Sequence, residues 1–561
     1  MIGIDLGTTN SLVAIMKDGE PEVLANELED VLTPSAVAVA EDGELLVGRA
    51  ARDRLIVDPD SGISQFKRDM GMDTRYSFGG REWTPTECSA VVLKEMKRIA
   101  EMHLGREVKS AVITVPAYFH DQQRLATVEA AEIAGIEVKR LVNEPTAAAL
   151  AYGYRQSDAE ENLFIFDLGG GTFDVTLLEV FEGVIEVKAS GGVSRLGGED
   201  YTDALAKWAI TQVGEEPDDE VRMRWRQQVE MAKRRLTKQE EVAVSVKGKE
   251  LVIRREDFQE AAKELTARIR PVIKRCLRDV NFETSDIDDV LLVGGASRMP
   301  LVVKLVAEEL GRVPNQTLDP DRVVALGAAV QSALVEGDEA VGDIVLTDVA
   351  PHTLGIETTH QLSETHREPG YYAPIIDRNT VVPVSRAKGF STLHPQQDTV
   401  TVKVYQGEAR KVSDNQKIGE FTVKGLKHQP AQRFPGDFEV RFSYDMNGLL
   451  EVEVTVLESG EKIAEVFEQR AGKLSKKEIE DAMKRLAPLK IHPRDKLPNR
   501  ARLERANRLY EELVGHARER LSFLVEDFER ALESEEEKEI NIAAAMLDNF
   551  VDPFFKEEEG R

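Results

Sequence analysis

Ile2-Gly-Ile-Asp5-Leu-Gly-Thr-Thr9 and Phe164-Ile-Phe-Asp167-Leu-Gly-Gly-Gly-Thr172 are two versions of one pattern. In each, an apolar run ends on Asp and enters a turn of Gly and Thr. A second apolar stretch follows, at Leu12–Met16 and at Phe173–Leu178. The pattern predicts a strand, a turn and a strand, twice. Such an internal repeat indicates two related halves.

Both turns are suited to holding phosphate. Gly permits positive φ angles and close approach of a ligand to backbone N–H groups, and Thr adds hydroxyl donors. Facing each other across a cleft, the turns would hold the β- and γ-phosphates of ATP, while Asp5 and Asp167 would ligate Mg²⁺ through water. The chain contains no G-x-x-x-x-G-K-[ST], so this is not a Walker A loop. The turn residues are Gly7, Thr8, Thr9, Asn10, Gly169, Gly170, Gly171 and Thr172.

Two further segments fit an adenosine site. Gly294 and Gly295 end the predicted strand Val290–Val293, where a flat base could lie against bare backbone. Four polar residues share one helix face by spacing. On their own they are typical of a surface salt-bridge cluster, and beside the turns they become candidate ribose and adenine contacts. These four are Glu230, Lys233, Arg234 and Thr237.

The composition and the hydrophobic periodicity of the chain change three times along its length. Up to about residue 335, strand-like runs such as Ala111–Val115 alternate with helical segments such as Glu87–Met102 and Thr146–Tyr154, which predicts α/β structure. Residues 336–348 look like a polar linker around one apolar tripeptide. A β-rich unit follows, with period-two runs and Asn447-Gly448 as a hairpin turn.

The C-terminal part is predicted to be helical from about Leu474. One apolar stripe on a single long helix is expected from spacings of three and four. The last residues, 556–561, are expected to fray. The stripe consists of Leu503, Ala506, Tyr510, Leu513, Ala517, Leu521, Leu524 and Phe528.

The 561-residue chain is acidic, with 73 Lys and Arg against 101 Asp and Glu and a net charge of −28. Such a surface repels phosphate backbones and anionic lipids, so we expect neither nucleic acid nor a membrane as a partner. Neither Cys88 nor Cys276 lies in a C-x-x-C, and no apolar run approaches a membrane span of about 18 residues. The N-terminus does not read as a secretory signal. We therefore expect a cytoplasmic protein.

Several motifs together resemble the heat shock protein 70 (Hsp70, DnaK-like) family of chaperones. Three of them look like the family's signatures: Ile4-Asp-Leu-Gly-Thr-Thr-Asn-Ser11, Phe166-Asp-Leu-Gly-Gly-Gly-Thr-Phe-Asp174 and Val293-Gly-Gly-Ala-Ser-Arg-Met-Pro300. Supporting matches are Val115-Pro-Ala-Tyr-Phe119, Asn143-Glu-Pro-Thr-Ala-Ala-Ala149 and Leu196-Gly-Gly-Glu-Asp200. The match runs nearly end to end.

The resemblance implies a multidomain protein. Its parts would be an actin-like duplicated α/β ATPase domain (1–335), an interdomain linker (336–348), a β-sandwich substrate-binding domain (349–472) and a C-terminal α-helical lid (473–561). The short length, with 391–398 and 491–495, looks like the short bacterial HscC-type branch. The function implied is that of an ATP-dependent chaperone that binds extended apolar segments of unfolded proteins.

The resemblance also assigns catalytic roles. Lys67 matches the family's catalytic lysine, Glu144 a glutamate near the metal and water, and Thr172 a threonine near the γ-phosphate. Taken alone, Lys67 would be a solvated surface lysine. The Glu144-Pro145 step also suits a helix start, with Pro at the first helical position. Phosphoryl transfer asks mainly for positioning and charge neutralisation, which this set provides. The implied cofactors are ATP or ADP and Mg²⁺, with K⁺ as a further candidate ion. The signatures add Gly197, Gly198, Ser297 and Arg298 to the nucleotide site.

Coupling and peptide-binding residues follow from the same resemblance. Pro116 and Arg124 match a relay of the nucleotide state, and Arg140 matches a docking position for J-domain co-chaperones. The linker elements are Ile344, Val345, Leu346 and Asp348. The groove for client peptides would be lined by Ile356, Thr359, Phe390, Leu393, Val400, Val402 and Val404.

The chain departs from the family's pattern in places. Alternating valines are typical of a core, so some of the groove residues are expected to be core as well. The segment Thr359–Ala373 is expected to be a loop longer than usual, with Thr359 and Leu393 forming the arch over a peptide. The stretch between Glu199 and Glu230 looks trimmed, which leaves open whether a nucleotide-exchange factor binds.

Two alternatives stand beside the chaperone. A sugar or acetate kinase of the actin-like superfamily would explain the phosphate turns but not the β-unit, the linker or the helical stripe. An actin-like filament protein is disfavoured by the long C-terminal extension.

Overall fold

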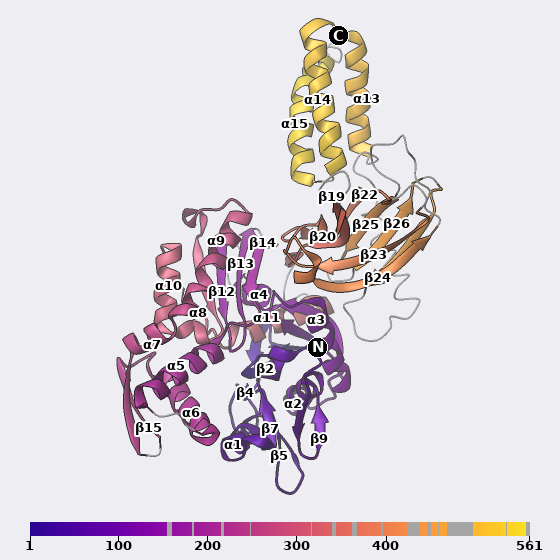
Figure 1. Ribbon diagram of the computed structural model, residues 1–561. Helices are drawn as coiled ribbons and strands as arrows, with labels where there is room; N and C mark the ends of the chain where they lie inside the picture. Colours follow the sequence, from indigo (N-terminus) through magenta and orange to yellow (C-terminus); the bar gives the residue numbers. More distant parts are fainter. Residues whose placement is uncertain are drawn as a thin grey trace. The chain divides into compact units, whose positions relative to one another are not determined.

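The computed structural model describes residues 1–153, 160–181, 184–214, 218–246, 248–315, 317–338, 344–361, 367–393, 397–424, 438–445, 450–457, 459–467, 497–534 and 536–556. The chain divides into two compact units. Unit 1 comprises the described residues of 1–352 and 378–382, and unit 2 comprises those of 353–377, 383–467 and 497–556. The mixed α/β character and the helical C-terminal part are visible in Figure 1.

Unit 1 contains two six-stranded sheets with the same internal order. In the first, the strand run is β11-β10-β1-β2-β3, with β4 on β2; in the second it is β17-β12-β13-β14-β18-β21. Three antiparallel strands are consecutive in each, and a later strand pairs in parallel with the first of them. The strands are β1 (Ile2–Asp5), β2 (Asn10–Lys17), β3 (Glu20–Val23), β4 (Thr33–Pro34), β10 (Ser110–Val115), β11 (Glu137–Asn143), β12 (Glu161–Leu168), β13 (Phe173–Phe181), β14 (Val184–Val193), β17 (Asp289–Val293), β18 (Val345–Val349) and β21 (Val381–Val382).

The two strand–turn–strand predictions are confirmed. The first copy forms β1 and β2, and the second forms β12 and β13. In both, the Asp of the motif lies at or near the end of the first strand, so the Gly/Thr turn begins where the sheet ends.

The remaining elements of unit 1 are helices and small sheets (Figure 1). The small sheets are β5 (Ala36–Val39), β6 (Leu45–Val47) and β7 (Gly62–Ser64); β8 (Tyr76–Phe78) and β9 (Arg81–Trp83); and β15 (Glu241–Val246) and β16 (Lys249–Arg254). The helices are α1 (Arg49–Val57), α2 (Pro85–Leu104), α3 (Asp121–Ile133), α4 (Glu144–Gly153), α5 (Gly198–Val213), α6 (Asp219–Arg235), α7 (Arg255–Ala261), α8 (Lys263–Ala267), α9 (Ile269–Asp279), α10 (Pro300–Leu310) and α11 (Val323–Glu336).

Helices α4 and α11 join the two halves of unit 1. Helix α11 contacts β1, β2 and β10 of the first sheet, whereas α4 contacts β12, β13 and β14 of the second. One apolar core contains residues of both helices and of both sheets. The contact between the helices is at backbone distance, because a Cβ on Gly327 would lie 1.6 Å from the carbonyl oxygen of Ala147. Only glycine fits at this crossing.

The segment predicted as a linker is partly ordered within unit 1. Helix α11 runs to Glu336, and β18 pairs in parallel with β14 through Val184↔Val345, Ile185↔Leu346 and Glu186↔Thr347. Leu346 is buried. An apolar tripeptide next to an open sheet edge gains both ladder hydrogen bonds and burial, so this part is a strand rather than an irregular connection. Residues 339–343 lie outside the described residues.

Unit 2 has two four-stranded antiparallel sheets, of order β20-β19-β23-β24 and β22-β25-β26-β27. The prediction of a loop over Thr359–Ala373 is wrong for its described part, because 359–361 and 367–373 belong to paired strands; Thr358↔Tyr371 is one pair. Asn447 and Gly448 lie outside the described residues. The strands are β19 (Leu354–Gln361), β20 (Arg367–Ile376), β22 (Val384–Phe390), β23 (Thr399–Gln406), β24 (Gln416–Lys424), β25 (Phe438–Tyr444), β26 (Leu450–Val456) and β27 (Lys462–Phe467).

The helical part of unit 2 contains α13 (Leu497–Glu512), α14 (Gly515–Ser534) and α15 (Glu537–Lys556). The prediction of one long helix is wrong: the stripe is divided between α13 and α14, with Gly515 at φ +61° where the chain turns. Leu503, Ala506, Leu521 and Phe528 nevertheless share one core with α15. A reversed second helix keeps the apolar spacing, so periodicity alone does not reveal the break.

We expect Gly327→Ala to destabilise unit 1, because its methyl group would collide with the α4 backbone. A Gly-to-Ala change inside a helix ordinarily stabilises by about 1 kcal/mol, whereas overpacking costs about 1–3 kcal/mol. Urea unfolding should show a lower midpoint. The matched control is Gly153→Ala at the end of α4, where the new Cβ meets only the Ile185 side chain, at 3.2 Å. An equal effect of the two variants would contradict the close helix contact.

Candidate functional site

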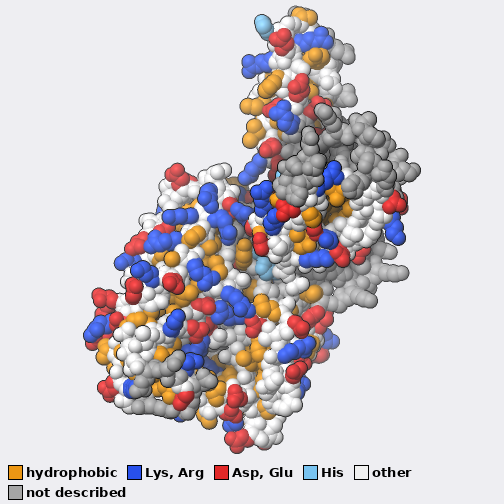
Figure 2. Space-filling model, in the orientation of Figure 1, with side chains coloured by type: hydrophobic (Ala, Val, Ile, Leu, Met, Phe, Trp, Pro, Cys, Tyr) orange, Lys and Arg blue, Asp and Glu red, His pale blue; other side chains and the backbone are white. Residues whose placement is uncertain are grey.

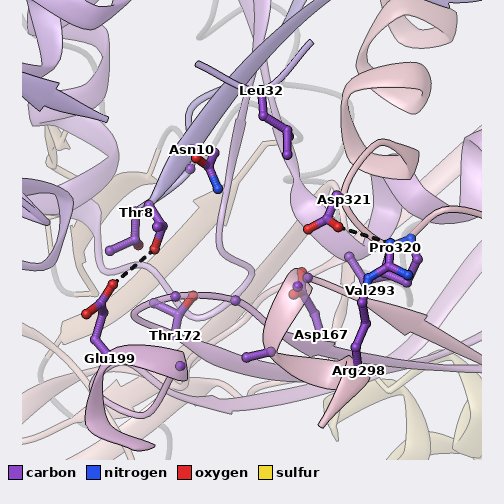
Figure 3. Close-up of a pocket in the computed structure, with 18 of the residues that line it drawn as sticks. Thr8, Asn10, Leu32, Asp167, Thr172, Glu199, Val293, Arg298, Pro320 and Asp321 are labelled. Atoms are coloured by element: carbon purple, nitrogen blue, oxygen red, sulfur yellow. Dashed lines mark hydrogen bonds and ion pairs between the residues drawn. The ribbon is translucent and has the colours of Figure 1, made fainter. Parts of the chain in front are cut away.

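A cavity of about 480 Å³ lies in unit 1 at the ends of β1 and β12. This volume is in the range of small-molecule sites. Both Gly/Thr turns line it: Gly7, Thr8, Thr9 and Asn10 from one half, and Gly169, Gly170 and Thr172 from the other. Figure 3 shows Thr8, Asp167 and Thr172 around this one cavity.

The loops around the cavity approach one another at backbone distance. A Cβ on Gly170 would lie 2.0 Å from the Thr9 hydroxyl oxygen, and a Cβ on Gly197 would lie 2.5 Å from the Gly170 carbonyl carbon. Gly294 has φ +77°, and its Cβ would lie 2.5 Å from the Leu168 carbonyl oxygen. Side chains at these positions would fill or spread the cradle. The glycines therefore leave backbone groups bare toward a ligand.

Lys67 and Glu144 form a buried ion pair at the cavity. The Lys67 Nζ atom lies 2.7 Å from Glu144 Oε1, and the two residues are 3% and 8% exposed. Lys67 comes from the short helical turn Phe66–Asp69, and Glu144 begins α4. The predicted helix start at the Glu-Pro step is confirmed. Lys67 is thus not a solvated surface lysine, and its ammonium faces the cavity that the turns enclose.

Three aspartates surround this pair. Burial, followed by the charge of Glu144, raises the pKa of Asp5 to about 7 and that of Asp174 to about 8. The same two causes raise the pKa of Asp167 well above its ordinary value. Asp5 Oδ1 also accepts a hydrogen bond of 3.1 Å from the Thr114 hydroxyl. The site therefore contains four carboxyl groups, those of the three aspartates and Glu144, but only the one ammonium of Lys67. This excess of acidic groups favours binding of an additional cation.

The donor chemistry fits a hydrated Mg²⁺ ion. Carboxylate oxygens are the ligands that Mg²⁺ prefers, and the ion commonly keeps most of its water. Among the described residues, no three His, Cys, Asp or Glu side chains are grouped closely enough to ligate a metal by themselves. Asp5 and Asp167 both line the cavity, which places two candidate outer ligands on one surface.

The residues expected around adenosine line the same cavity. Glu230, Lys233, Arg234 and Thr237 come from α6 and the turn after it, and Gly198, Gly294, Gly295 and Arg298 lie nearby. Lys233 Nζ is 2.6 Å from Glu230 Oε2 and 2.7 Å from the Gly198 carbonyl oxygen. Arg298 is held by Asp319 and Asp321, at 2.6 and 3.0 Å. Glu230, Lys233 and Arg234 lie on α6 as the spacing predicted, whereas Thr237 lies in the turn after the helix, so the prediction of one helix face is wrong for Thr237.

Three predicted nucleotide residues do not line the cavity. They are Gly171, Gly197 and Ser297, and each instead supports a neighbouring loop. The analysis of the sequence also missed lining residues. Glu199 lies in the motif Leu196-Gly-Gly-Glu-Asp200, so an acidic side chain next to two glycines was a usable signal. No sequence signal pointed to Asp321, because it lies in a loop without a recognisable motif and reaches the cavity only in the folded structure. The full set missed is Leu12, Leu32, Glu199, Lys238, Val293, Ala296, Met299, Pro320, Asp321 and Val324.

The predicted coupling residues gather in unit 1 near β18. Pro116 is buried after β10, and Arg124 of α3 is buried, not exposed. Arg124 Nη2 donates to Asn143 Oδ1 at 2.6 Å, and Asn143 Nδ2 donates to Asp348 Oδ2 at 2.8 Å. Arg140 is half-buried in β11. Asn143 thereby connects α3 to the linker strand.

The predicted peptide-binding residues lie in unit 2, and their exposure differs. Ile356, Val402 and Val404 are 4%, 2% and 0% exposed, so they belong to the interior. Ile356 and Val404 are paired in adjacent strands. Leu393 is 41% exposed. Thr359, Phe390 and Val400 are half-buried.

None of the described helices is long and apolar enough to cross a lipid bilayer.

Comparisons with known proteins agree on one family. The family model described as "Hsp70 protein" matches residues 1–78 and 72–558. The chain is 42% identical to "Chaperone protein DnaK" of Thermotoga maritima over 499 residues, which covers 85% of this chain and 82% of that protein. It is 41% identical to the protein of that name from Thermosipho africanus over 507 residues, covering 86% and 83%.

An α/β unit with a phosphate-suited cavity, joined to a β-rich and helical unit, agrees with an ATP-driven chaperone. The chain belongs to the Hsp70 family, and it is accordingly an ATPase and a chaperone of the DnaK type. The kinase alternative receives no support from these comparisons. On the face shown in Figure 2, acidic and basic side chains are interspersed over unit 1.

We expect Asp174→Asn to flatten the pH dependence of stability in the nucleotide-free protein. Asp174 is 1% exposed, and folding raises its pKa from 3.8 to about 8, so the folded chain holds a proton that the unfolded chain releases. Its contribution is fully present below about pH 4 and is lost as the pH rises toward 8. Asn keeps the shape but does not titrate.

Urea midpoints between pH 5 and pH 8 measure this effect. The wild type should lose at least about 1 kcal/mol more than Asp174→Asn over this range, since one pKa unit corresponds to about 1.4 kcal/mol. The exposed Asp53→Asn variant is the control and should follow the wild type. Parallel curves for wild type and Asp174→Asn would show that the buried carboxyl does not titrate as described.

Proposed function

We propose that this chain hydrolyses Mg·ATP in the cavity of unit 1 and uses the hydrolysis to change the affinity of unit 2 for extended apolar peptides. The observation that carries the proposal is the meeting of both Gly/Thr turns at one cavity beside the buried Lys67–Glu144 pair. That arrangement provides phosphate positioning from two sides and a fixed cation next to the γ-phosphate position, which phosphoryl transfer requires.

The proposed domains are an actin-like duplicated ATPase domain over 1–335, a linker over 336–348, a β-sandwich over 349–472 and a helical lid over 473–561. The matching strand order of the two large sheets supports a duplicated fold. The division between the compact units falls between His352 and Thr353, close to the proposed linker. Two four-stranded antiparallel sheets support a sandwich.

In the ATPase site, backbone N–H groups of the turns hold the phosphates, with the hydroxyls of Thr8, Thr9 and Thr172 as further donors. Asp5 and Asp167 hold Mg²⁺ through water, and the ion when bound neutralises phosphate charge. Lys67 and Glu144 orient the water that attacks the γ-phosphorus, and Lys67 offsets negative charge there. K⁺ is a second proposed ion.

We propose that the less buried of the predicted peptide-binding residues line a groove on unit 2. Phe390, Val400 and Leu393 offer apolar surface, while Ile356, Val402 and Val404 support it from the interior. An extended peptide gains affinity from backbone hydrogen bonds and selectivity from apolar pockets. The arch formed by Thr359 and Leu393 remains a proposal.

Coupling is proposed to run through β18. The chain Arg124–Asn143–Asp348 holds this strand to α3 in the state described, and Ile344, Val345 and Leu346 would leave the sheet edge in another nucleotide state. Pro116 and Arg140 complete the relay, with Arg140 as the contact for a J-domain co-chaperone. We also propose a cytoplasmic location and membership of the HscC-type branch.

We expect ATP to accelerate release of a bound apolar heptapeptide, and the peptide with a J-domain protein to raise steady-state ATP hydrolysis several-fold. Fluorescence anisotropy and a phosphate-release assay measure these effects. A heptapeptide of the same length made of Asp, Gly and Ser is the control and should do neither. Phosphorylation of a sugar or acetate, without any effect of the peptide, would contradict the proposal.

A further inference from the structure

Two histidine rings stack next to β18, the strand in which the predicted linker ends. His120 precedes α3, and His352 follows β18. Their ring centroids are 4.7 Å apart at an interplanar angle of 25°. The Tyr118 ring meets His352 edge-on, with centroids 4.3 Å apart. The three rings belong to unit 1, and they attach the residues after β18 to the segment between β10 and α3.

Both imidazoles are enclosed in a way that suits only their neutral forms. His352 is 2% exposed. The Nδ1 atom of His120 and the Nε2 atom of His352 are buried, and neither has a hydrogen-bond partner among the described residues. A proton added at either nitrogen would therefore create an unpaired buried charge. Such a charge is far more costly than an unpaired neutral nitrogen.

The positive charge of Arg124 next to the two rings disfavours protonation of either imidazole. Arg124 is buried beside the rings, where it is fixed by the carbonyl oxygens of Ala117 and Phe119, both at 3.2 Å. Burial first, then Arg124, lowers the pKa of His120. Burial, then His120 and Arg124, with a smaller effect of Arg275, lowers the pKa of His352 well below its ordinary value.

Acidic groups near the rings are already engaged. Asp348 of β18 accepts from Asn143 and itself has a pKa raised by burial. Asp174 of β13 accepts a hydrogen bond of 3.3 Å from the backbone N–H of Tyr118. A backbone hydrogen bond at Tyr118 favours the charged form of His352, but it is outweighed. No carboxylate in the described part of the chain is hydrogen-bonded to either imidazole.

We propose that the His120–His352 stack is an acid-sensitive latch: while both rings are neutral it holds β18 against β14, and protonation of either ring separates the stack and releases the strand. The proposal concerns the same docking of β18 that the proposed coupling uses, but it adds only an acid response, so its failure would leave the proposed function intact.

The direction of the effect follows from proton linkage. The docked state binds fewer protons than the released state, in which each imidazole regains its ordinary pKa of about 6.5. Docking is therefore at full strength above about pH 7 and weakens as the pH falls through 6.5. Between pH 7.5 and pH 5.5 the docking equilibrium falls about 10-fold if one ring takes up the proton, and about 100-fold if both do. Asp348 acts in the opposite direction, because burial raises its pKa in the docked state and acid therefore favours docking through this group.

Hydrogen–deuterium exchange of the full-length protein tests the latch. The protection of the β18 amides, corrected for intrinsic exchange, is compared with that of the β12 amides in the same molecule at pH 7.5 and pH 5.5. We expect β18 protection to fall 10- to 100-fold in acid while β12 protection stays constant. Equal behaviour of the two strands would overturn the proposal.

Two variants identify the groups responsible. His352→Leu keeps apolar bulk without a titrating group, and His120→Asn supplies a residue that suits the start of a helix; each should reduce the acid loss, and the double variant should abolish it. The matched control His516→Gln, at a fully exposed position, should behave as the wild type. If His352→Leu already lowers β18 protection at pH 7.5, the test is the change in its protection between pH 7.5 and pH 5.5, which should be smaller than in the wild type. An undiminished acid loss in the double variant would overturn the assignment.

Discussion

One ammonium group shared by four carboxyl groups is the constraint on which the rest of unit 1 depends. Lys67 lies 2.7 Å from Glu144, and Asp5, Asp167 and Asp174 are all buried close enough for their pKa values to rise. Burying charges of one sign without enough partners is unfavourable. The protein accepts this arrangement at the ends of β1 and β12, where a hydrated metal ion would supply the missing positive charge.

The duplicated architecture supplies the geometry that this constraint needs. Each half contributes a strand that ends near an Asp and a turn rich in Gly or Thr, and α4 and α11 hold the halves together at backbone distance. Glu144 is the first residue of α4, so the helix that joins the halves also delivers the partner of Lys67. From the same region Asn143 reaches Asp348 of β18. The site and β18 are thus contacted by two adjacent residues, at the junction of β11 and α4.

Much of this could be predicted from the sequence, because the turns carry a local signal that repeats. Gly7–Asn10, Gly169, Gly170 and Thr172 line the cavity as expected, although Gly171 does not, and the Glu144-Pro145 step marked a helix start. Where local signals were absent or ambiguous, prediction failed. The break between α13 and α14 preserves the apolar spacing, so one helix was expected.

Tertiary effects account for the other failures. Thr359–Ala373 was expected to be a loop, although partner strands order its described part. Asp321 reaches the cavity from a loop without a motif, and the burial of Lys67 became clear only with the fold. His120 and His352 are 232 positions apart in the sequence, and only the docking of β18 brings their rings together. Contacts of this kind are set by folding rather than by local pattern.

The most direct test of the central claim is single-turnover ATP hydrolysis by Lys67→Met, measured together with equilibrium ATP binding. If Lys67 stabilises charge and water at the γ-phosphate, hydrolysis falls about 100-fold or more while ATP affinity stays within about tenfold. Thr172→Ala should behave alike, and Lys304→Met, at an exposed position of α10, should match the wild type. Unchanged hydrolysis in Lys67→Met would contradict the account.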